Sequence, residues 1–418
     1  MISDQPQNAP HDRAPCPPDR GRTGPARPAV LAVRAGNLFD GRRALGPGTV
    51  LTEGRRITAV DTSGSMPPAH AEVVDLGAGA WLLPGLIDTH VHLCFDAQDD
   101  VAGRLPDTDD TTLLTAMRAA ARTAVHAGVT TVRDLGDRNY LSLALARDIA
   151  AHPGTGPHIV ASGPPLTVPG GHCHFLGGEA RGADAVRAAV RERHARGCSV
   201  VKVMASGGVM TPGSAAHLSQ YGPRELRAAV EEAHRLGLPA VAHVHGGQAV
   251  VDAVDAGFDG IEHVTFMTVD GVAADAGAIH KIVRSGVFVG TTVGQRPGAR
   301  PLSTGAAARR SGIREVRRRL LSAGARMTAG SDAGIAPDKP HNVLPHGIEA
   351  LVGIGMTPVE ALRAATSEAA IACRAQDRKG MLAPGRDADL LAVGPGLLTD
   401  ITALRDVRAV FREGIRVR

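Results

Sequence analysis

The middle of the chain alternates short apolar runs with longer amphipathic segments. Apolar runs of roughly four to eight residues predict buried strands, whereas apolar residues spaced three or four positions apart predict helices. Helical patterns such as 111–126, 224–236 and 313–323 lie between the apolar runs. The predicted strands, eight in number, lie at 82–92, 129–134, 158–161, 200–204, 240–243, 260–263, 287–290 and 327–332.

This alternation predicts an α/β fold of the (β/α)8 TIM barrel type, since each apolar strand is followed by a crossover helix. An open, doubly wound sheet is the alternative. The Gly-x-Gly-x-x-Gly motif of that fold does not follow the first predicted strand, which favours the barrel.

The two ends of the chain have a different pattern. Residues 28–84 and 380–418 contain short apolar runs broken by Gly and Asp, which is typical of small antiparallel strands. We expect both ends to form one small β-sandwich domain, with the barrel at 85–379 between them. Residues 1–27 are rich in Pro, Asp, Arg and Gly without periodicity, and we expect a disordered tail there.

Composition narrows the classes of function. Aromatic residues make up only 2%, which argues against a stacking platform for single-stranded nucleic acid, and the net charge of +4 comes from interspersed residues. We find no apolar run of membrane-spanning length and no apolar core of a secretory signal. The five cysteines are widely spaced, which indicates reduced thiols. We therefore expect a cytoplasmic protein that binds a small molecule and neither nucleic acid nor membrane.

Two histidines end the first predicted strand. Because side chains alternate along a strand, His90 and His92 point to one face and Val91 points to the other. Two neighbouring imidazoles at the end of a buried strand form half of a metal site. For this motif alone, a hydrogen-bonded core histidine is an equally good interpretation.

Other predicted strands end in further metal-binding side chains. His243 and His245 follow the fifth strand, His263 ends the sixth, and Asp332 ends the eighth. Active residues of such barrels lie at the carboxyl ends of the strands, so these side chains should meet at one rim. Each alone could be an ordinary strand-end or turn residue, but chance explains the whole set poorly.

Lys202 lies inside the fourth apolar strand and is one of only four lysines in the chain. A buried ammonium group is costly to desolvate and would be repelled by metal ions. Both problems disappear if the amine has reacted with carbon dioxide. The resulting carbamate is an anion whose two oxygens can bridge two metal ions.

The ordered set of motifs resembles the amidohydrolase superfamily, in its binuclear branch with a carboxylated lysine. The matching segments are 84–92, 201–204, 242–246, 261–263 and 329–332, and the run 382–390 resembles that family's return to its small β domain. The resemblance implies that His90 and His92 bind a buried metal ion and that carboxylated Lys202 bridges both ions. It further implies that His243 and His263 bind the more exposed ion.

The resemblance also implies a mechanism. Two divalent ions, most simply zinc, would share a hydroxide that is available near neutral pH, because metal binding lowers the pKa of water to about 7. Asp332 would bind the buried metal, take the proton of the attacking hydroxide and deliver it to the leaving amine.

Within the superfamily the chain is most similar to metal-dependent dipeptidases, prolidases and an ochratoxin-degrading amidase. The shared segments are 170–175, 205–214 and 221–223. Such enzymes release a C-terminal amino acid from a dipeptide or an N-acyl amino acid. The candidate substrate-binding residues are His172, Tyr221 and His245, from a pool that also holds His174, His217, Arg224 and Arg133.

Two other functions stay open. A hydrolase of a cyclic amide, similar to imidazolonepropionase, fits the outline, but that enzyme type lacks the bridging lysine, so Lys202 argues against it. A catalytically silent metal-binding scaffold would keep the metal ligands without turnover. Relatives are often homo-oligomers, and we expect the same here, although the pattern shows no interface.

Overall fold

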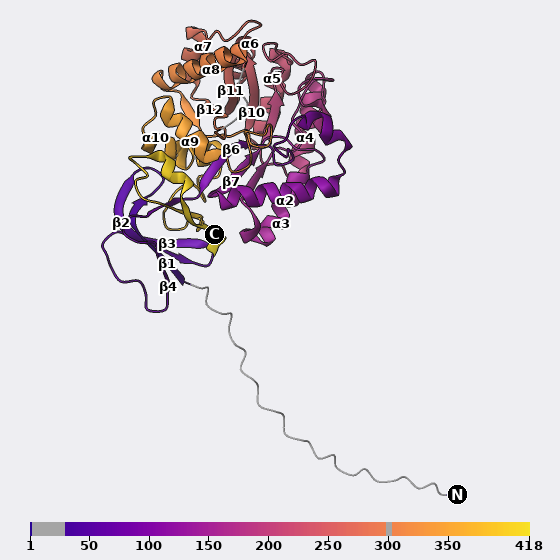
Figure 1. The fold of residues 1–418 in the computed structure, drawn as a ribbon. Coiled ribbons are helices and arrows are strands. Elements are labelled where there is room, and N and C mark those ends of the chain that lie inside the picture. Colours follow the sequence, from indigo (N-terminus) through magenta and orange to yellow (C-terminus); the bar gives the residue numbers. More distant parts are fainter. Residues whose placement is uncertain (2–29, 298–302) are drawn as a thin grey trace.

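The computed structural model describes residue 1, residues 30–297 and residues 303–418. The tail predicted at 1–27 lies outside these ranges apart from Met1. The remaining chain forms a barrel with a smaller β domain beside it (Figure 1).

Strands from both ends of the chain make the smaller sheet. It runs in the order β16-β15-β14-β5-β1-β2-β3, with β4 paired to β1. Val33, Leu38, Val50 and Phe411 belong to its apolar core. The strands are β1 (Val30–Phe39), β2 (Ala44–Glu53), β3 (Arg56–Asp61), β4 (Glu72–Asp75), β5 (Trp81–Pro84), β14 (Leu390–Val393), β15 (Val407–Arg412) and β16 (Ile415–Arg416).

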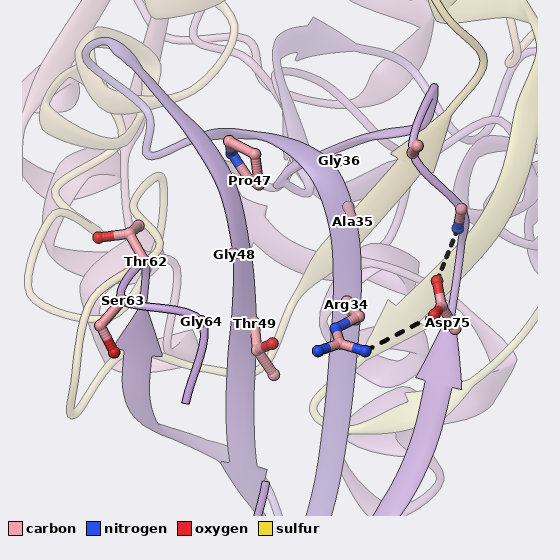
Figure 2. A pocket seen from close by; sticks show the side chains of 12 residues that line it. Arg34, Ala35, Gly36, Pro47, Gly48, Thr49, Thr62, Ser63, Gly64 and Asp75 are labelled. Carbon is pink, nitrogen blue, oxygen red and sulfur yellow. Dashed lines mark hydrogen bonds and ion pairs between the residues drawn. The ribbon is translucent and has the colours of Figure 1, made fainter. Parts of the chain in front are cut away.

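A shallow pocket opens on this sheet. Figure 2 shows that residues of β1 and β2 line it and that Arg34 faces Asp75 of β4, with 4.0 Å between their charged atoms. The lining includes none of the residues that we predicted for the active site. The pocket is therefore a feature of the small domain rather than part of the candidate centre.

The barrel consists of two runs of parallel strands. One contains β6 (Leu86–Val91), β7 (Val129–Asp134) and β8 (His158–Ala161), and the other has the order β13-β12-β11-β10-β9. Parallel bridges between Leu166 and Val203 and between Val91 and Ala333 join the two runs. The fold prediction is confirmed. The second run comprises β9 (Val201–Met204), β10 (Ala240–Gly246), β11 (Gly260–Met267), β12 (Phe288–Gly290) and β13 (Arg326–Thr328).

Helices follow the barrel strands, as expected for crossover connections. Two predicted helices match α2 and α5 within one residue at each end, but α8 begins well before residue 313. Ser303 caps it by accepting a hydrogen bond from the backbone N–H of Ala306. The helices are α1 (Val101–Arg104), α2 (Asp110–His126), α3 (Leu141–Ala151), α4 (Ala183–Arg196), α5 (Pro223–Arg235), α6 (Gly247–Ala256), α7 (Ala276–Ser285), α8 (Thr304–Ser322), α9 (Leu344–Gly353), α10 (Pro358–Ala364) and α11 (Ser367–Ala372).

The first predicted strand, 82–92, is two strands, which corrects the sequence interpretation. β5 pairs antiparallel with β14 in the small sheet, whereas β6 pairs parallel with β7 in the barrel. Gly85 separates them, and a Cβ at this position would lie 2.1 Å from Oγ1 of Thr130. The chain needs glycine for this close approach to β7. We propose domain boundaries at 84/85 and 379/380.

Two further observations bear on the class of protein. Across the described ranges, the helices all lack the combination of length and hydropathy that a membrane crossing requires. The four described cysteines are buried and unpaired, namely Cys94, Cys173, Cys198 and Cys373.

Candidate active site

Six buried side chains meet in two clusters at the carboxyl ends of the barrel strands. One cluster holds His90, His92 and Asp332, and within each cluster the candidate ligand atoms lie within 4.8 Å of one another. The rings of His90 and His263 are 5.0 Å apart, so the clusters adjoin. The second cluster holds His243, His245 and His263.

Asp332 lies between the clusters. Its Oδ1 is 3.5 Å from Nε2 of His90 and 3.6 Å from Nε2 of His92, while its Oδ2 is 4.0 Å from Nδ1 of His263. The backbone is left-handed at two of these residues, with φ of +58° at Asp332 and +72° at His263. Such left-handed conformations cost about 1–3 kcal/mol each in non-glycine residues and concentrate at functional sites.

Each histidine of the first cluster has one ring nitrogen bound by the protein. His90 donates from Nδ1 to Oε2 of Glu262 at 2.9 Å, and His92 donates from Nδ1 to the carbonyl of Gly136 at 3.0 Å. Because a carboxylate or a carbonyl only accepts, the opposite nitrogen, Nε2, carries the lone pair. A histidine that binds a metal ion needs this arrangement.

In the second cluster a carbonyl or hydroxyl oxygen contacts one ring nitrogen of each histidine. His243 donates from Nε2 to the carbonyl of Gly207 at 3.1 Å, which leaves Nδ1 with the lone pair. His245 and His263 use Nδ1 toward the hydroxyls of Thr265 (2.8 Å) and Thr292 (3.1 Å). The lone pair is thus assigned to the nitrogen that faces away from the protein acceptor in His90, His92 and His243, whereas a hydroxyl can serve either tautomer of His245 and His263.

Burial keeps these histidines neutral. It lowers the pKa of His92 to about 4 and that of His245 to about 4. The pKa values of His90, His243 and His263 fall well below the usual range, chiefly through burial. Neutral imidazole is the form that binds metal ions, so the clusters fit divalent cations at neutral pH.

Lys202 of β9 has no exposed surface, and its Nζ has no hydrogen-bond partner among the residues that the structure describes. Burial lowers the pKa of Lys202 to about 8. Val241 of β10 is the register partner of Lys202, so the lysine lies beside the strand that carries His243 and His245, and its positive charge contributes to the low pKa values of His90 and His263. A buried amine without a partner at this position is compatible with a lysine that is carboxylated before it binds metal ions.

Glu262 is a site residue that the sequence interpretation missed. It is 1% exposed and accepts from His90 on one oxygen and from Nη2 of Arg133, at 2.8 Å, on the other. Burial raises the pKa of Glu262, and Arg133 opposes this shift. A Cβ at Gly290 of β12 would lie 1.9 Å from Oε2 of Glu262, so the neighbouring strand leaves room for the carboxylate. Glu262 thereby fixes the ring of His90.

Arg133, which the sequence placed in the pool of substrate candidates, pairs with Glu262 instead. Besides Glu262, its guanidinium donates to the carbonyls of Thr89 at 2.7 Å and Ala372 at 3.1 Å. These bonds use all three nitrogens, so Arg133 supports the centre from within the barrel. Glu262 is a charged residue inside an apolar strand, as Lys202 is. That pattern could have identified Glu262, and with it the need for a buried cation such as Arg133, from the sequence.

The substrate candidates differ in their surroundings. His172 follows β8, its ring lies 4.7 Å from that of His243, and burial lowers its pKa to about 3. His245 belongs to the second cluster. Tyr221 is buried, and its hydroxyl donates to the carbonyl of Ala180 at 2.8 Å. Arg224 is an exposed charge in the first turn of α5.

Comparison with known proteins identifies the family. Residues 81–417 match the profile of the Amidohydrolase family. The chain belongs to this family. Ochratoxinase of Aspergillus niger is 29% identical over 79% of this chain and 73% of its own length. An uncharacterised protein of Mycobacterium tuberculosis is 30% identical over 78% of this chain and 85% of its own length.

Solved structures agree with this assignment. A Xaa-Pro dipeptidase with methionine bound in its active site superposes with a TM-score of 0.83 at 26% identity, covering 93% of this chain and 99% of the dipeptidase. As an amidohydrolase with such neighbours, the protein is an enzyme that hydrolyses amide bonds. The two histidine clusters are its candidate metal sites.

Proposed function

We propose that this amidohydrolase releases a C-terminal amino acid from dipeptides or N-acyl amino acids, with two divalent metal ions, most simply zinc. The observation that carries the proposal is the amine of Lys202, which is buried and unpartnered within the described chain beside two clusters of neutral histidines. As a carbamate it would supply the anion that two neighbouring cations require.

The chain offers a ligand set for each ion. His90, His92 and Asp332 would hold one, His243 and His263 would hold the other, and carboxylated Lys202 would bind both. When bound, the two ions would supply an activated water molecule and polarise the scissile carbonyl. The alternative of a silent scaffold would need the same ligands, so only turnover separates it from the enzyme.

Asp332 is the proposed proton carrier. Its carboxylate lies between the clusters, 3.5 Å from His90 on one oxygen and 4.0 Å from His263 on the other. From this position it can accept a proton from the attacking water and donate it to the leaving amine. We assign His172, whose ring lies beside that of His243, and His245 of the second cluster to the substrate. We also retain Tyr221, which would have to release its bond to Ala180 in order to bind substrate.

The test is metal analysis of the purified enzyme together with a substrate panel. The panel contains dipeptides, N-acetyl amino acids, their C-terminal amides and a cyclic amide of the imidazolone type. We expect two metal ions per chain and turnover of the substrates with a free C-terminal carboxylate. Turnover of the cyclic amide alone would favour the alternative enzyme, and bound metal without any amide turnover would favour the scaffold.

Metal loading is expected to depend on carbon dioxide and on pH. The Lys202 amine, with a pKa of about 8, reacts with carbon dioxide only when it is neutral, so carbamate formation is fastest above that pH. At constant dissolved carbon dioxide, zinc uptake by the metal-free enzyme should slow about tenfold for each pH unit below 8. A coloured zinc indicator would follow uptake, with buffer purged of carbon dioxide as the control. Equal uptake in the purged buffer would contradict the carbamate.

We also propose a cytoplasmic location and a homo-oligomeric state. The buried, unpaired cysteines support a reducing compartment. The oligomeric state is carried over from the family resemblance and is open to measurement by light scattering.

A further inference from the structure

Three residues at the ends of neighbouring barrel strands have left-handed backbone conformations. The φ angles are +72° at His263, +43° at Thr292 and +58° at Asp332. His263 lies in β11, Thr292 follows β12 and Asp332 follows β13. Such a conformation costs a non-glycine residue about 1–3 kcal/mol and persists only where the surrounding structure holds it. The contacts that hold these residues therefore also hold two candidate metal ligands, His263 and Asp332.

The ammonium group of Lys339 makes two of these contacts. Its Nζ donates to the carbonyl of Ser331 at 2.7 Å and to the carbonyl of Thr292 at 3.1 Å. Ser331 directly precedes Asp332, so the first bond holds the peptide group between these two residues. The second bond holds the peptide group that follows Thr292. One side chain thus joins the segments that follow β12 and β13.

Backbone hydrogen bonds hold the N–H sides of the same two peptide groups. The N–H of Asp332 donates to the carbonyl of His90 at 2.8 Å, and the N–H of Val293 donates to the carbonyl of Gly330 at 2.9 Å. Among the residues that the structure describes, only Lys339 donates to the carbonyl sides. A peptide group that is bound on both sides cannot rotate without losing a hydrogen bond. Lys339 therefore completes the support of both groups.

The two peptide groups hold one ligand of each cluster. Asp332 follows the first group directly and carries the carboxylate of the first cluster. Thr292 precedes the second group, and its hydroxyl lies 3.1 Å from Nδ1 of His263 in the second cluster. A change in the position of the Lys339 ammonium would therefore reach both clusters.

The loop that carries Lys339 is fixed to the end of β6. The N–H of Gly334 donates to the carbonyl of Lys339 at 2.8 Å, which closes the loop. The N–H groups of His92 and Ala97 donate to the carbonyls of Ala333 at 3.0 Å and Gly334 at 2.8 Å. The backbone of Lys339 is thus held in place, and its side chain is anchored at both ends.

We propose that Lys339 is a positioning residue of the metal centre, which holds the peptide groups next to Asp332 and Thr292 and, through them, one ligand of each cluster. The inference rests on the proposed binuclear centre. An ammonium group suits this role because it has three N–H donors and can serve two carbonyls at once. Removal of a group that orients metal ligands typically lowers metal affinity or activity by about 10- to 100-fold.

Cobalt(II) binding by the metal-free protein, in buffer that contains bicarbonate, tests the proposal without relying on turnover. Lys339→Met removes the donors, and Lys339→Gln keeps an amide donor on a shorter side chain. Lys281→Met is the matched control, because Lys281 is partly exposed and pairs with Asp255 at 2.6 Å. We expect Lys339→Met to weaken cobalt binding about 10- to 100-fold and to change the visible absorption spectrum of bound cobalt. Lys339→Gln should have smaller effects, and Lys281→Met should match the wild type.

The wild type and the variants answer different questions. A wild type that binds no cobalt would overturn both the proposed centre and the role of Lys339. If the wild type binds two ions, and Lys339→Met keeps its spectrum and an affinity within about twofold, only the role of Lys339 is overturned.

Thermal unfolding of the metal-free protein separates positioning from a purely structural role. A purely structural lysine would lower the Tm in Lys339→Met, yet the folded variant would keep the wild-type cobalt spectrum and affinity, and this result overturns the proposal. A changed spectrum and weaker binding in a folded variant support it. If Lys339→Met does not fold, Lys339→Gln decides by the same two measurements.

Discussion

Lys202→Ala is expected to lose both metal ions and the amide turnover together. The substitution removes the only group that the proposal places on both ions. Turnover should fall by at least about 10³-fold, the scale on which removal of one catalytic electrostatic group acts. Elemental analysis gives the metal content, and release of amino acid from an N-acyl substrate gives the rate.

A matched lysine serves as the control. Lys281 is partly exposed on α7 and pairs with Asp255 at 2.6 Å, so Lys281→Ala should keep the metal content and the rate of the wild type. If Lys202→Ala kept two ions and an undiminished rate, the bridging role and the proposed mechanism would both be wrong.

Asp332→Asn is expected to reduce kcat by about 10²- to 10⁴-fold, the range for loss of a general acid–base group. The amide retains an oxygen for metal binding but cannot carry the proton to the leaving amine. Metal content should therefore fall less than activity. The comparison of an alkyl amide (an N-acyl amino acid) with an anilide (the 2-aminobenzoate of the same acyl group), both with a free carboxylate, isolates this step.

The anilide leaves with less need for protonation, so its rate in Asp332→Asn should fall less than that of the alkyl amide. Equal losses for the two substrates would assign Asp332 to metal binding alone. The wild type, measured with both substrates, provides the reference ratio.

Local patterns predicted much of the barrel. The strands at 129–134 and 158–161 match β7 and β8 at both ends, because both are compact apolar runs bounded by turns. The gathering of His90, His243, His263 and Asp332 could also be foreseen, since the carboxyl ends of parallel strands meet at one rim.

Features that depend on distant neighbours could not be read from these patterns. The close approach of Gly85 to Thr130, which accompanies the break between β5 and β6, cannot be read from the run 82–92. Arg317, Arg318 and Arg319 form a row of three arginines, and the sequence cannot show how their environments differ. The fold distinguishes them, because Arg318 is exposed and Arg319 binds Ala274.

The pairing of β5 with β14 places a constraint on biosynthesis. Leu82 pairs with Ala392, and the whole barrel lies between them in sequence. On the ribosome, the strand that leads into His90 emerges long before its partner is made. Contacts between such distant segments form late, because loop closure costs entropy before the contacts repay it. Nascent chains that end before Leu390 therefore lack β14, the strand that pairs antiparallel with β5. This enzyme acquires its final architecture only after nearly all of the chain has been translated.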